Sequence, residues 1–208
     1  MISDRDDLLQ QLNVSRETEE RLDTYVALLR KWTKRINLVS PKTVDDIWTR
    51  HIADSAQLLS FKPADASKWA DLGSGGGFPG AVVAILSSEA HPNLDVSLVE
   101  ADQRKAAFLR SVSRQTGVDF AVIAERIEDV GPIGADVVSA RALAPLSQLL
   151  GYVDRHLKAG GTALLPKGAG WRQENASALE KWRFDCKNYP SKTDADAVIL
   201  EIGEIKRV

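Results

Sequence analysis

Cysteine is nearly absent from this chain of 208 residues, in which Cys186 stands alone. A single cysteine excludes an internal disulfide and any metal site built from several cysteines. No apolar run approaches the roughly 20 residues that a membrane span needs. The acidic N-terminus, residues 1–7, lacks the apolar core of a signal peptide. We therefore expect a cytoplasmic protein without a membrane partner.

The chain also lacks a large net charge of either sign. The formal net charge is −2, so no global basic field attracts nucleic acid, and any RNA binding must use local clusters of cations. Two such clusters occur, one over residues 30–35 and one over residues 104–114. Each is typical either of a solvated helix surface or of a phosphate-binding patch, and the sequence leaves that choice open.

From residue 67 onward, short apolar runs alternate with helical patterns. Strands are predicted at 69–72, 94–100, 120–124, 136–140, 162–165 and 197–202, and helices at 79–89, 102–116, 145–158 and 171–182. This alternation predicts an α/β fold with a doubly wound, mostly parallel sheet and crossover helices. Two earlier helices are predicted over 15–38 and 43–59. We accordingly divide the chain into a helical N-terminal region, residues 1–64, and a Rossmann-like domain, residues 65–208.

A glycine-rich loop joins the first predicted strand to a helix. Its sequence is Asp71-Leu-Gly-Ser-Gly-Gly-Gly-Phe-Pro-Gly80. Glycines at such a turn let bare backbone approach a ligand and accept positive φ angles. The N-terminus of the following helix adds unpaired N–H groups and a partial positive charge. The loop therefore predicts a site for a nucleotide-like cofactor.

Three classes of cofactor use loops of this kind. A P-loop needs a lysine after its glycines, and none follows here, which argues against nucleoside triphosphate hydrolysis. A dinucleotide pattern occurs formally at Gly75, Gly77 and Gly80, but Phe78-Pro79 crowds the place of a pyrophosphate. S-adenosylmethionine needs one acid before the loop and another after the second strand, and Asp71 and Glu100 meet both requirements. Glu100 suits the ribose of either cofactor, so an NAD(P)-dependent oxidoreductase stays as the alternative.

Several further segments carry a family resemblance. They are Asn37-Leu-Val39, Arg50-His-Ile-Ala-Asp-Ser55, the loop 71–80, Arg104-Lys-Ala-Ala-Phe-Leu109, Ser139-Ala-Arg-Ala-Leu-Ala-Pro145 and Lys167-Gly168. In this order and spacing the chain resembles the 16S ribosomal RNA guanine-N7 methyltransferases, the glucose-inhibited division protein B family, over about residues 20–170. The resemblance implies a class I methyltransferase fold with a helical N-terminal extension. It also implies S-adenosylmethionine as cofactor, without a metal, and guanine 527 of 16S RNA, naked or in the 30S subunit, as substrate.

The resemblance assigns roles by position. Gly73, Gly75 and Phe78 fall on its cofactor loop, with Asp71 and Glu100 as the flanking acids. Ile127 and Glu128 fall on the segment that meets the adenine, where Ile127 replaces a usual alanine, and aspartate is common in place of Glu100. Arg141 lies beside the methyl-transfer site, as the catalytic and substrate-binding residue next to the cofactor. Lys167, at the end of the fifth strand, is predicted to steady RNA phosphate. We expect a monomer.

The chemistry expected of these residues needs no general base. N7 of guanine carries an in-plane lone pair and no proton, so alignment and electrostatics suffice. Arg141 is better placed on O6 or a phosphate than on N7, because donating to N7 would occupy the attacking lone pair. The spacing of His51 and Asp54 predicts that they pair and brace the cofactor loop. A non-catalytic RNA-binding module on the same fold is the remaining alternative.

Overall fold

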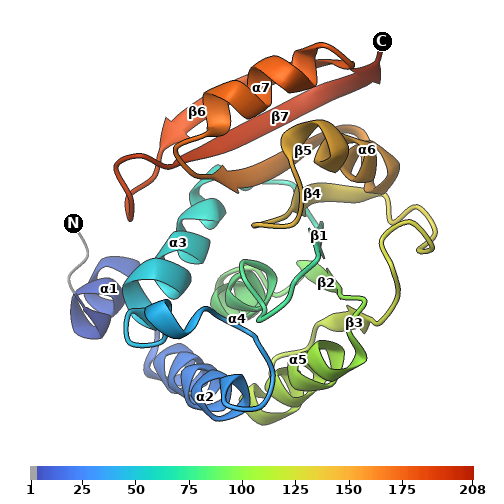
Figure 1. The fold of residues 1–208 in the computed structure, drawn as a ribbon. Coiled ribbons are helices and arrows are strands. Elements are labelled where there is room, and N and C mark those ends of the chain that lie inside the picture. The colour runs from blue at the N-terminus through green and yellow to red at the C-terminus, as the bar shows by residue number, and fades with distance from the viewer. Residues whose placement is uncertain (1–3) are drawn as a thin grey trace.

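The computed structural model describes residues 4–208, which form a seven-stranded sheet with helices on both faces (Figure 1). The strands are β1 Lys68–Leu72, β2 Asp95–Val99, β3 Ala121–Ile123, β4 Ala135–Ser139, β5 Leu157–Lys167, β6 Trp182–Pro190 and β7 Val198–Arg207. Their order is β3-β2-β1-β4-β5-β7-β6. β1 to β5 are parallel, while β7 runs antiparallel to both β5 and β6. The predicted doubly wound, mostly parallel sheet is confirmed.

Seven α-helices accompany the sheet within the described residues. They are α1 Arg5–Leu12, α2 Arg16–Thr33, α3 Ala53–Ala56, α4 Gly80–Ala90, α5 Gln103–Thr116, α6 Leu146–His156 and α7 Trp171–Leu179. Short 3-10 turns cover Pro41–Thr43 and Gln57–Phe61, and a π-helix covers Ile47–Ile52. The predicted helices after residue 67 therefore exist, and their ends differ from the prediction by at most three residues.

The two faces of the sheet bury alternate residues of each strand, as the period of two requires. Trp69 of β1 and Val137 of β4 join the cluster that contains α4 and α5. Their neighbours Ala70 and Val138 join the cluster that contains α6 and α7. The central strands β1 and β4 are thus covered on both faces, so a ligand can reach them at their ends.

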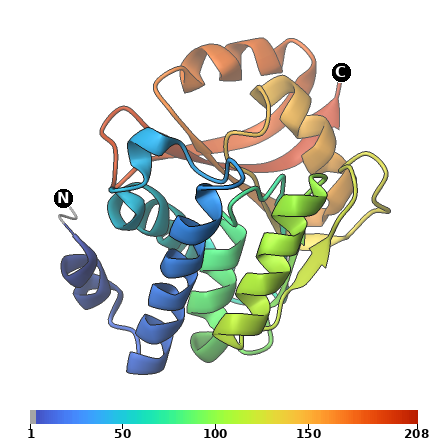
Figure 2. The same cartoon turned by 60° about the horizontal axis from the view of Figure 1, so that its bottom comes forward.

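The N-terminal helices pack onto the α4 and α5 side of the sheet. Leu22, Tyr25 and Leu29 of α2 are buried in the same cluster as Phe108 of α5, and the Tyr25 and Phe108 rings are 6.4 Å apart. Figure 2 shows α2, α4 and α5 side by side. This packing places the C-terminal end of α2 next to the glycine loop, so the N-terminal region contributes directly to the site described below.

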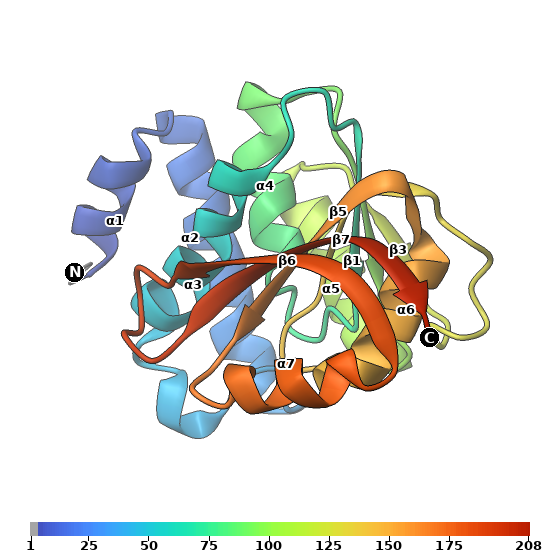
Figure 3. The same ribbon diagram turned by 90° about the horizontal axis from the view of Figure 1, so that it is seen from above.

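Several parts of the fold differ from the sequence prediction. Helix α1 was not predicted, and α2 ends at Thr33, where a helix to residue 38 was expected. The single helix expected over 43–59 is a succession of 3-10, π- and α-helical segments. The helix expected over 171–182 ends at Leu179, and β6 follows it without having been predicted. β6 pairs only with β7 and is mostly exposed, so it lacks the alternating apolar pattern that identifies a strand. Viewed from above, β6 and β7 run together along the sheet, with α7 beside them (Figure 3).

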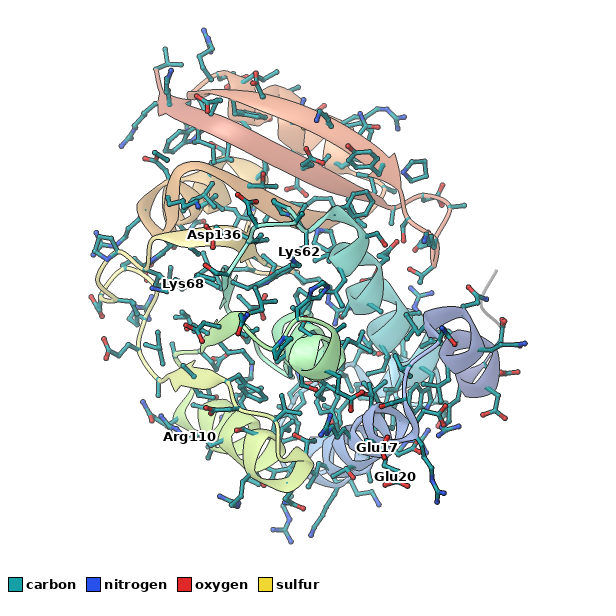
Figure 4. All side chains as sticks on the ribbon, turned by 180° about the vertical axis from the view of Figure 1, so that it is seen from behind. Glu17, Glu20, Lys62, Lys68, Arg110 and Asp136 are labelled. Carbon is teal, nitrogen blue, oxygen red and sulfur yellow. The ribbon has the colours of Figure 1, made fainter. Side chains whose placement is uncertain are left out.

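Asp136 ties the connection before β1 to the start of β4. Its Oδ2 accepts hydrogen bonds from the backbone N–H groups of Ser67 and Lys68, both at 2.8 Å, and its Oδ1 pairs with Lys158. These contacts hold the pKa of Asp136 well below its usual value, the Lys158 contact most strongly. Asp136 and Lys68 lie together when the molecule is seen from behind (Figure 4), because Lys68 is the first residue of β1 and Asp136 the second residue of the neighbouring β4. In the described residues, no helix has the length and apolar character to cross a membrane.

Candidate active site

The glycine loop turns sharply between β1 and α4 and approaches its neighbours closely. A Cβ atom added at Gly80 would lie 2.6 Å from Cβ of Asp71, so no larger residue fits there. A Cβ atom added at Gly75 would meet only the Gly73 carbonyl oxygen, at 3.8 Å, and would otherwise point into open space. The hydroxyl of Tyr25 donates to the carbonyl of Gly76 at 2.5 Å, which lets α2 hold the loop. The loop is thus fixed by its surroundings and open on one side.

Asp71 braces this loop from within the sheet. The residue is fully buried, its Oδ1 accepts from the hydroxyl of Ser139 at 2.7 Å, and its Oδ2 accepts from the N–H of Gly80 at 3.1 Å. Burial raises the pKa of Asp71 to about 6, although the hydrogen bonds, that of Ser139 first, act to lower it. Asp71 does not line the cavity beside the loop. The structure therefore places it as a positioning residue for α4 and β4, and the direct cofactor contact predicted from the sequence stays a prediction.

A cavity of about 400 Å³ opens on the exposed side of the loop. It is lined by Gly73, Gly75, Glu100, Ile127, Glu128 and Tyr152, among others. Glu100 directly follows β2, and its two carboxylate oxygens accept hydrogen bonds from the N–H groups of Gly75 and Asp102, each at 2.8 Å. A carboxylate has about four acceptor sites, so Glu100 is held in place with capacity left for two hydroxyl groups. Five of the predicted cofactor residues, Gly73, Gly75, Glu100, Ile127 and Glu128, thus meet in one cavity.

The far wall of the cavity is tied to α6. The carbonyl of Ile127 accepts a hydrogen bond from Nε2 of the buried His156, at 3.1 Å. The carboxylate of Glu128 accepts from the hydroxyl of Tyr152 at 2.8 Å. Sequence patterns gave no sign of His156 or Tyr152, because they follow the segment 127–128 by more than twenty residues and act through it.

Arg141 follows β4 and lies in a cage made by the irregular helical segment. Its Nη1 is 3.2 Å from Oδ2 of Asp54, its Nη2 is 2.9 Å from Nδ1 of His51, and its guanidinium lies 4.9 Å from the centre of the Phe78 ring. Only 18% of the Arg141 side chain is exposed. The pairing of His51 with Asp54 that their spacing predicted is therefore wrong, because each of them binds Arg141 instead. The π-helix Ile47–Ile52 carries the His51 end of this cage, and such segments frequently occur at functional sites.

The hydrogen bonds of His51 fix its tautomer. An arginine can only donate, so Nδ1 of His51 accepts from Arg141 and the ring proton sits on Nε2, which donates to Oγ1 of Thr43 at 2.9 Å. Burial lowers the pKa of His51 to about 4, assisted by the charges of Arg141 and Arg50. His51 is therefore neutral at physiological pH. It also stacks on Phe78, with ring centres 4.9 Å apart, and so links Arg141 to the cofactor loop.

Replacing His51 with asparagine should remove one component of the pH dependence of stability. Above pH 6.5 the ring is neutral in both the folded and unfolded chain. Between about pH 6.5 and 4 the unfolded chain binds a proton that the folded protein rejects, so the free energy of unfolding falls as the pH falls. Asparagine cannot take that proton, yet it offers one acceptor and one donor. Urea unfolding of both proteins at pH 7, 6 and 5 should show the wild type losing more stability. Parallel losses would contradict the neutral buried imidazole.

A larger cleft of about 690 Å³ lies on the other side of Arg141. It is lined by Leu38, His51, Asp54, Arg141, Lys167 and Thr193, among others. Thr193 belongs to the turn between β6 and β7 and donates to Oδ1 of Asp54 at 3.1 Å, so the C-terminal strands form one wall. The segment 142–145 lines both the cleft and the cavity beside the glycine loop. Two ligands, one in the cleft and one in the cavity, would therefore lie next to each other at this segment. We refer to the cleft and the cavity together as the two hollows.

Lys167 lies in the cleft wall with an intramolecular partner. Its Nζ is 2.8 Å from Oε2 of Glu174 and 3.1 Å from the carbonyl of Ala144, and 10% of its side chain is exposed. Glu174 also accepts from the N–H of Leu146 at 2.9 Å. Lys167 and Glu174 together thus hold the segment between the two hollows. The phosphate contact predicted for Lys167 stays a prediction, to be weighed against this clamp.

Lys167→Met should separate the clamp from a phosphate contact. Hydrogen bonds to charged groups contribute about 1.5–3 kcal/mol each when buried. Because 35% of the Glu174 side chain is exposed, solvent screens its bond, and the loss of both bonds should lower the free energy of unfolding by about 1–3 kcal/mol. The effect should be strongly non-additive with Glu174→Gln in a double-mutant cycle measured by urea unfolding. Unchanged stability together with weaker RNA binding would instead support the phosphate contact.

Comparisons with known proteins agree with this geometry. The GidB family model, described as rRNA small subunit methyltransferase G, matches residues 18–198. A ribosomal RNA small subunit methyltransferase G from Ruegeria pomeroyi is 52% identical over 95% of this chain and 96% of its own length. One from Cereibacter sphaeroides is 48% identical over 98% and 99%.

Solved structures share the fold at low sequence identity. The mitomycin 7-O-methyltransferase MmcR covers 98% of this chain and 72% of its own, with a TM-score of 0.59 and 14% identity. A TehB-like SAM-dependent methyltransferase from Corynebacterium glutamicum covers 85% and 98%, with a TM-score of 0.57 and 15% identity. These structures support the expected class I methyltransferase fold.

Proposed function

The chain belongs to the rRNA small subunit methyltransferase G family, and on that premise we propose that it transfers a methyl group from S-adenosylmethionine to N7 of guanine 527 in 16S rRNA. The observation that carries the proposal is the pair of hollows that meet at segment 142–145, beside Arg141. One hollow suits a nucleoside cofactor and the other a nucleotide of the substrate. A transfer between two bound ligands needs this arrangement.

The residues around the smaller cavity fit S-adenosylmethionine. Glu100 has free acceptor sites for the two ribose hydroxyls, while Ile127 and Glu128 border the space for the adenine. The open side of Gly75 leaves room for the methionine part. When bound, this cofactor supplies an electrophilic methyl group on a positively charged sulfur. Asp71 supports the same site indirectly, because it holds Gly80 at the start of α4.

The chain's own residues then have only to position the guanine and exclude water. N7 has a lone pair and no proton to lose, so no base is required. Arg141 is fixed by Asp54, His51 and Phe78, which leaves a preorganised cation in the larger cleft, next to the segment that both hollows share. We assign it to O6 of the guanine or to a neighbouring phosphate, where its charge favours the correct orientation without blocking N7.

The test is a methyl-transfer assay with radiolabelled S-adenosylmethionine on 30S particles from a strain that lacks the enzyme, with the modified base mapped. Naked 16S RNA in a parallel reaction identifies the form of substrate. Labelling of a single guanine at N7 is the expected result. Labelling of another atom or base would reject the proposal. Binding of NADH without binding of S-adenosylhomocysteine in a calorimetric titration would favour the oxidoreductase alternative instead.

A further inference from the structure

Positive charge is concentrated in two stretches of the chain, although its net charge is −2. Between Asp23 and Asp45 there are five cations and no acid, and between Asp102 and Asp119 there are four cations and no acid. The cations are Arg30, Lys31, Lys34, Arg35 and Lys42 in the first stretch and Arg104, Lys105, Arg110 and Arg114 in the second. Mixed charge would be expected for a helix surface whose only task is solubility.

The fold brings three of these cations, Lys31, Arg35 and Arg104, to one groove between α2 and α5. The C-terminal half of α2 packs against α5, where Trp32 meets Phe108 edge to face with ring centres 5.7 Å apart. The acids of α2 lie in its first half, and Figure 4 shows Glu17 and Glu20 from behind, at the end where the strands begin. The opposite end of α2 therefore presents cations alone.

A groove of about 470 Å³ runs along the seam between the two helices. Its apolar lining is Leu28, Trp32, Ile36 and Ala107, and its cations are Lys31, Arg35 and Arg104. Arg104 pairs with Asp102 at 3.0 Å. No ion pair within residues 4–208 involves Lys31 or Arg35, and both are exposed. The groove thus combines an aromatic apolar floor with unneutralised cations at its edge.

The groove lies next to both hollows of the candidate active site. Ile36 lines it, and Leu38, two residues later, lines the cleft that contains Arg141. On the other helix, Arg104 lines the groove and Lys105 lines the cofactor cavity. A strand of nucleic acid whose target base lies in the cleft would have its neighbouring nucleotides close to this seam.

We propose that the α2–α5 groove binds a single-stranded nucleotide of the rRNA near the target guanine, with its base against Trp32 and its phosphates on Lys31, Arg35 and Arg104. This inference rests on the proposed function. An apolar aromatic floor accepts any base, and cations that track a backbone supply the attraction. A membrane surface is less suitable, because insertion needs exposed apolar side chains. The large exposed ones in the described residues are Leu179 and Val208, which lie outside the groove.

The first test removes the unpaired cations. Lys31→Ser/Arg35→Ser should raise KM for undermethylated 30S particles at least tenfold and reduce the slope of log KM against log salt by about 1.5, as for two lost single-strand phosphate contacts. The turnover number and the affinity for S-adenosylhomocysteine should not change. The control is Lys181→Ser/Lys206→Ser, which removes the same charge from exposed lysines outside the groove and should change KM less than twofold. Equal effects of both variants would overturn the proposal.

The second test fills the groove without changing its charge. Ala107→Leu adds three carbon atoms at an exposed helical position in the lining and should raise KM about three- to tenfold with an unaltered salt slope. An unchanged KM would reject base binding in the groove. Fluorescence anisotropy with a 16S RNA fragment measures RNA affinity for the same variants without requiring turnover. If the wild type bound RNA in the groove but transferred no methyl group, the proposed function would be rejected and the groove proposal would stand. Tighter binding to acidic phospholipid vesicles than to RNA would overturn the choice of partner.

Discussion

Replacement of Gly75 with valine is expected to weaken binding of S-adenosylhomocysteine at least 100-fold. The glycine N–H donates to Glu100, and a Cβ atom here would meet only the Gly73 carbonyl before pointing into the cavity of about 400 Å³. The two methyl groups of valine would therefore occupy ligand space. The φ angle of +56° adds backbone strain, because β-branched residues rarely adopt it. Isothermal titration calorimetry measures the loss.

A matched control separates the filled cavity from the strained backbone. Gly134 has a φ angle of +65° and nothing within 4 Å of an added Cβ atom, and it lies outside the cavity. Gly134→Val should thus lose a similar amount of stability in thermal unfolding, while its affinity for S-adenosylhomocysteine should equal that of the wild type. If Gly75→Val also bound it normally, Gly75 would serve only the turn, and the methionine part would have to lie elsewhere.

The sheet was predictable because buried strands leave a continuous apolar signal. The runs at 69–72 and 136–140 correspond to β1 and β4, which are covered by helices on both faces. β6 left no such signal, because Trp182 is the only buried one of its nine residues, two are half-buried and the other six are exposed. An edge strand of this kind is specified by pairing with its neighbour, here β7, the next strand in the chain, and not by burial of its own side chains.

The cofactor cavity was likewise predictable in its outline, because its residues follow successive parallel strands that end at the same edge. What the sequence did not reveal is the direction of each side chain. Asp71 pairs in register with Ser139 across β1 and β4, and this pairing turns its carboxylate into the sheet. The cage around Arg141 depends on residues about ninety positions earlier, and no local spacing reports such contacts.

Replacement of Arg141 with lysine is expected to reduce methyl transfer at least 100-fold while the affinity for S-adenosylhomocysteine changes less than threefold. Two guanidinium nitrogens engage Asp54 and His51 at once, and the planar group lies over Phe78. Lysine keeps the charge, yet its ammonium is a point donor that cannot reproduce this fork. The cation would therefore lose its fixed position in the larger cleft, and rate enhancement by preorganised charge is sensitive to such a shift.

Arg21→Lys is the matched control for Arg141→Lys. Its Nη1 contacts Ser88 at 3.1 Å and Glu89 at 2.8 Å, and 28% of its side chain is exposed, so it is another partly buried arginine between two elements. It lines neither hollow. Arg21→Lys should leave both transfer and cofactor affinity within twofold of the wild type. If Arg141→Lys lost cofactor affinity and transfer to the same extent, Arg141 would act on the cofactor side. If it lost neither, the cage would be a structural link between the N-terminal region and β4, and another group would have to orient the guanine.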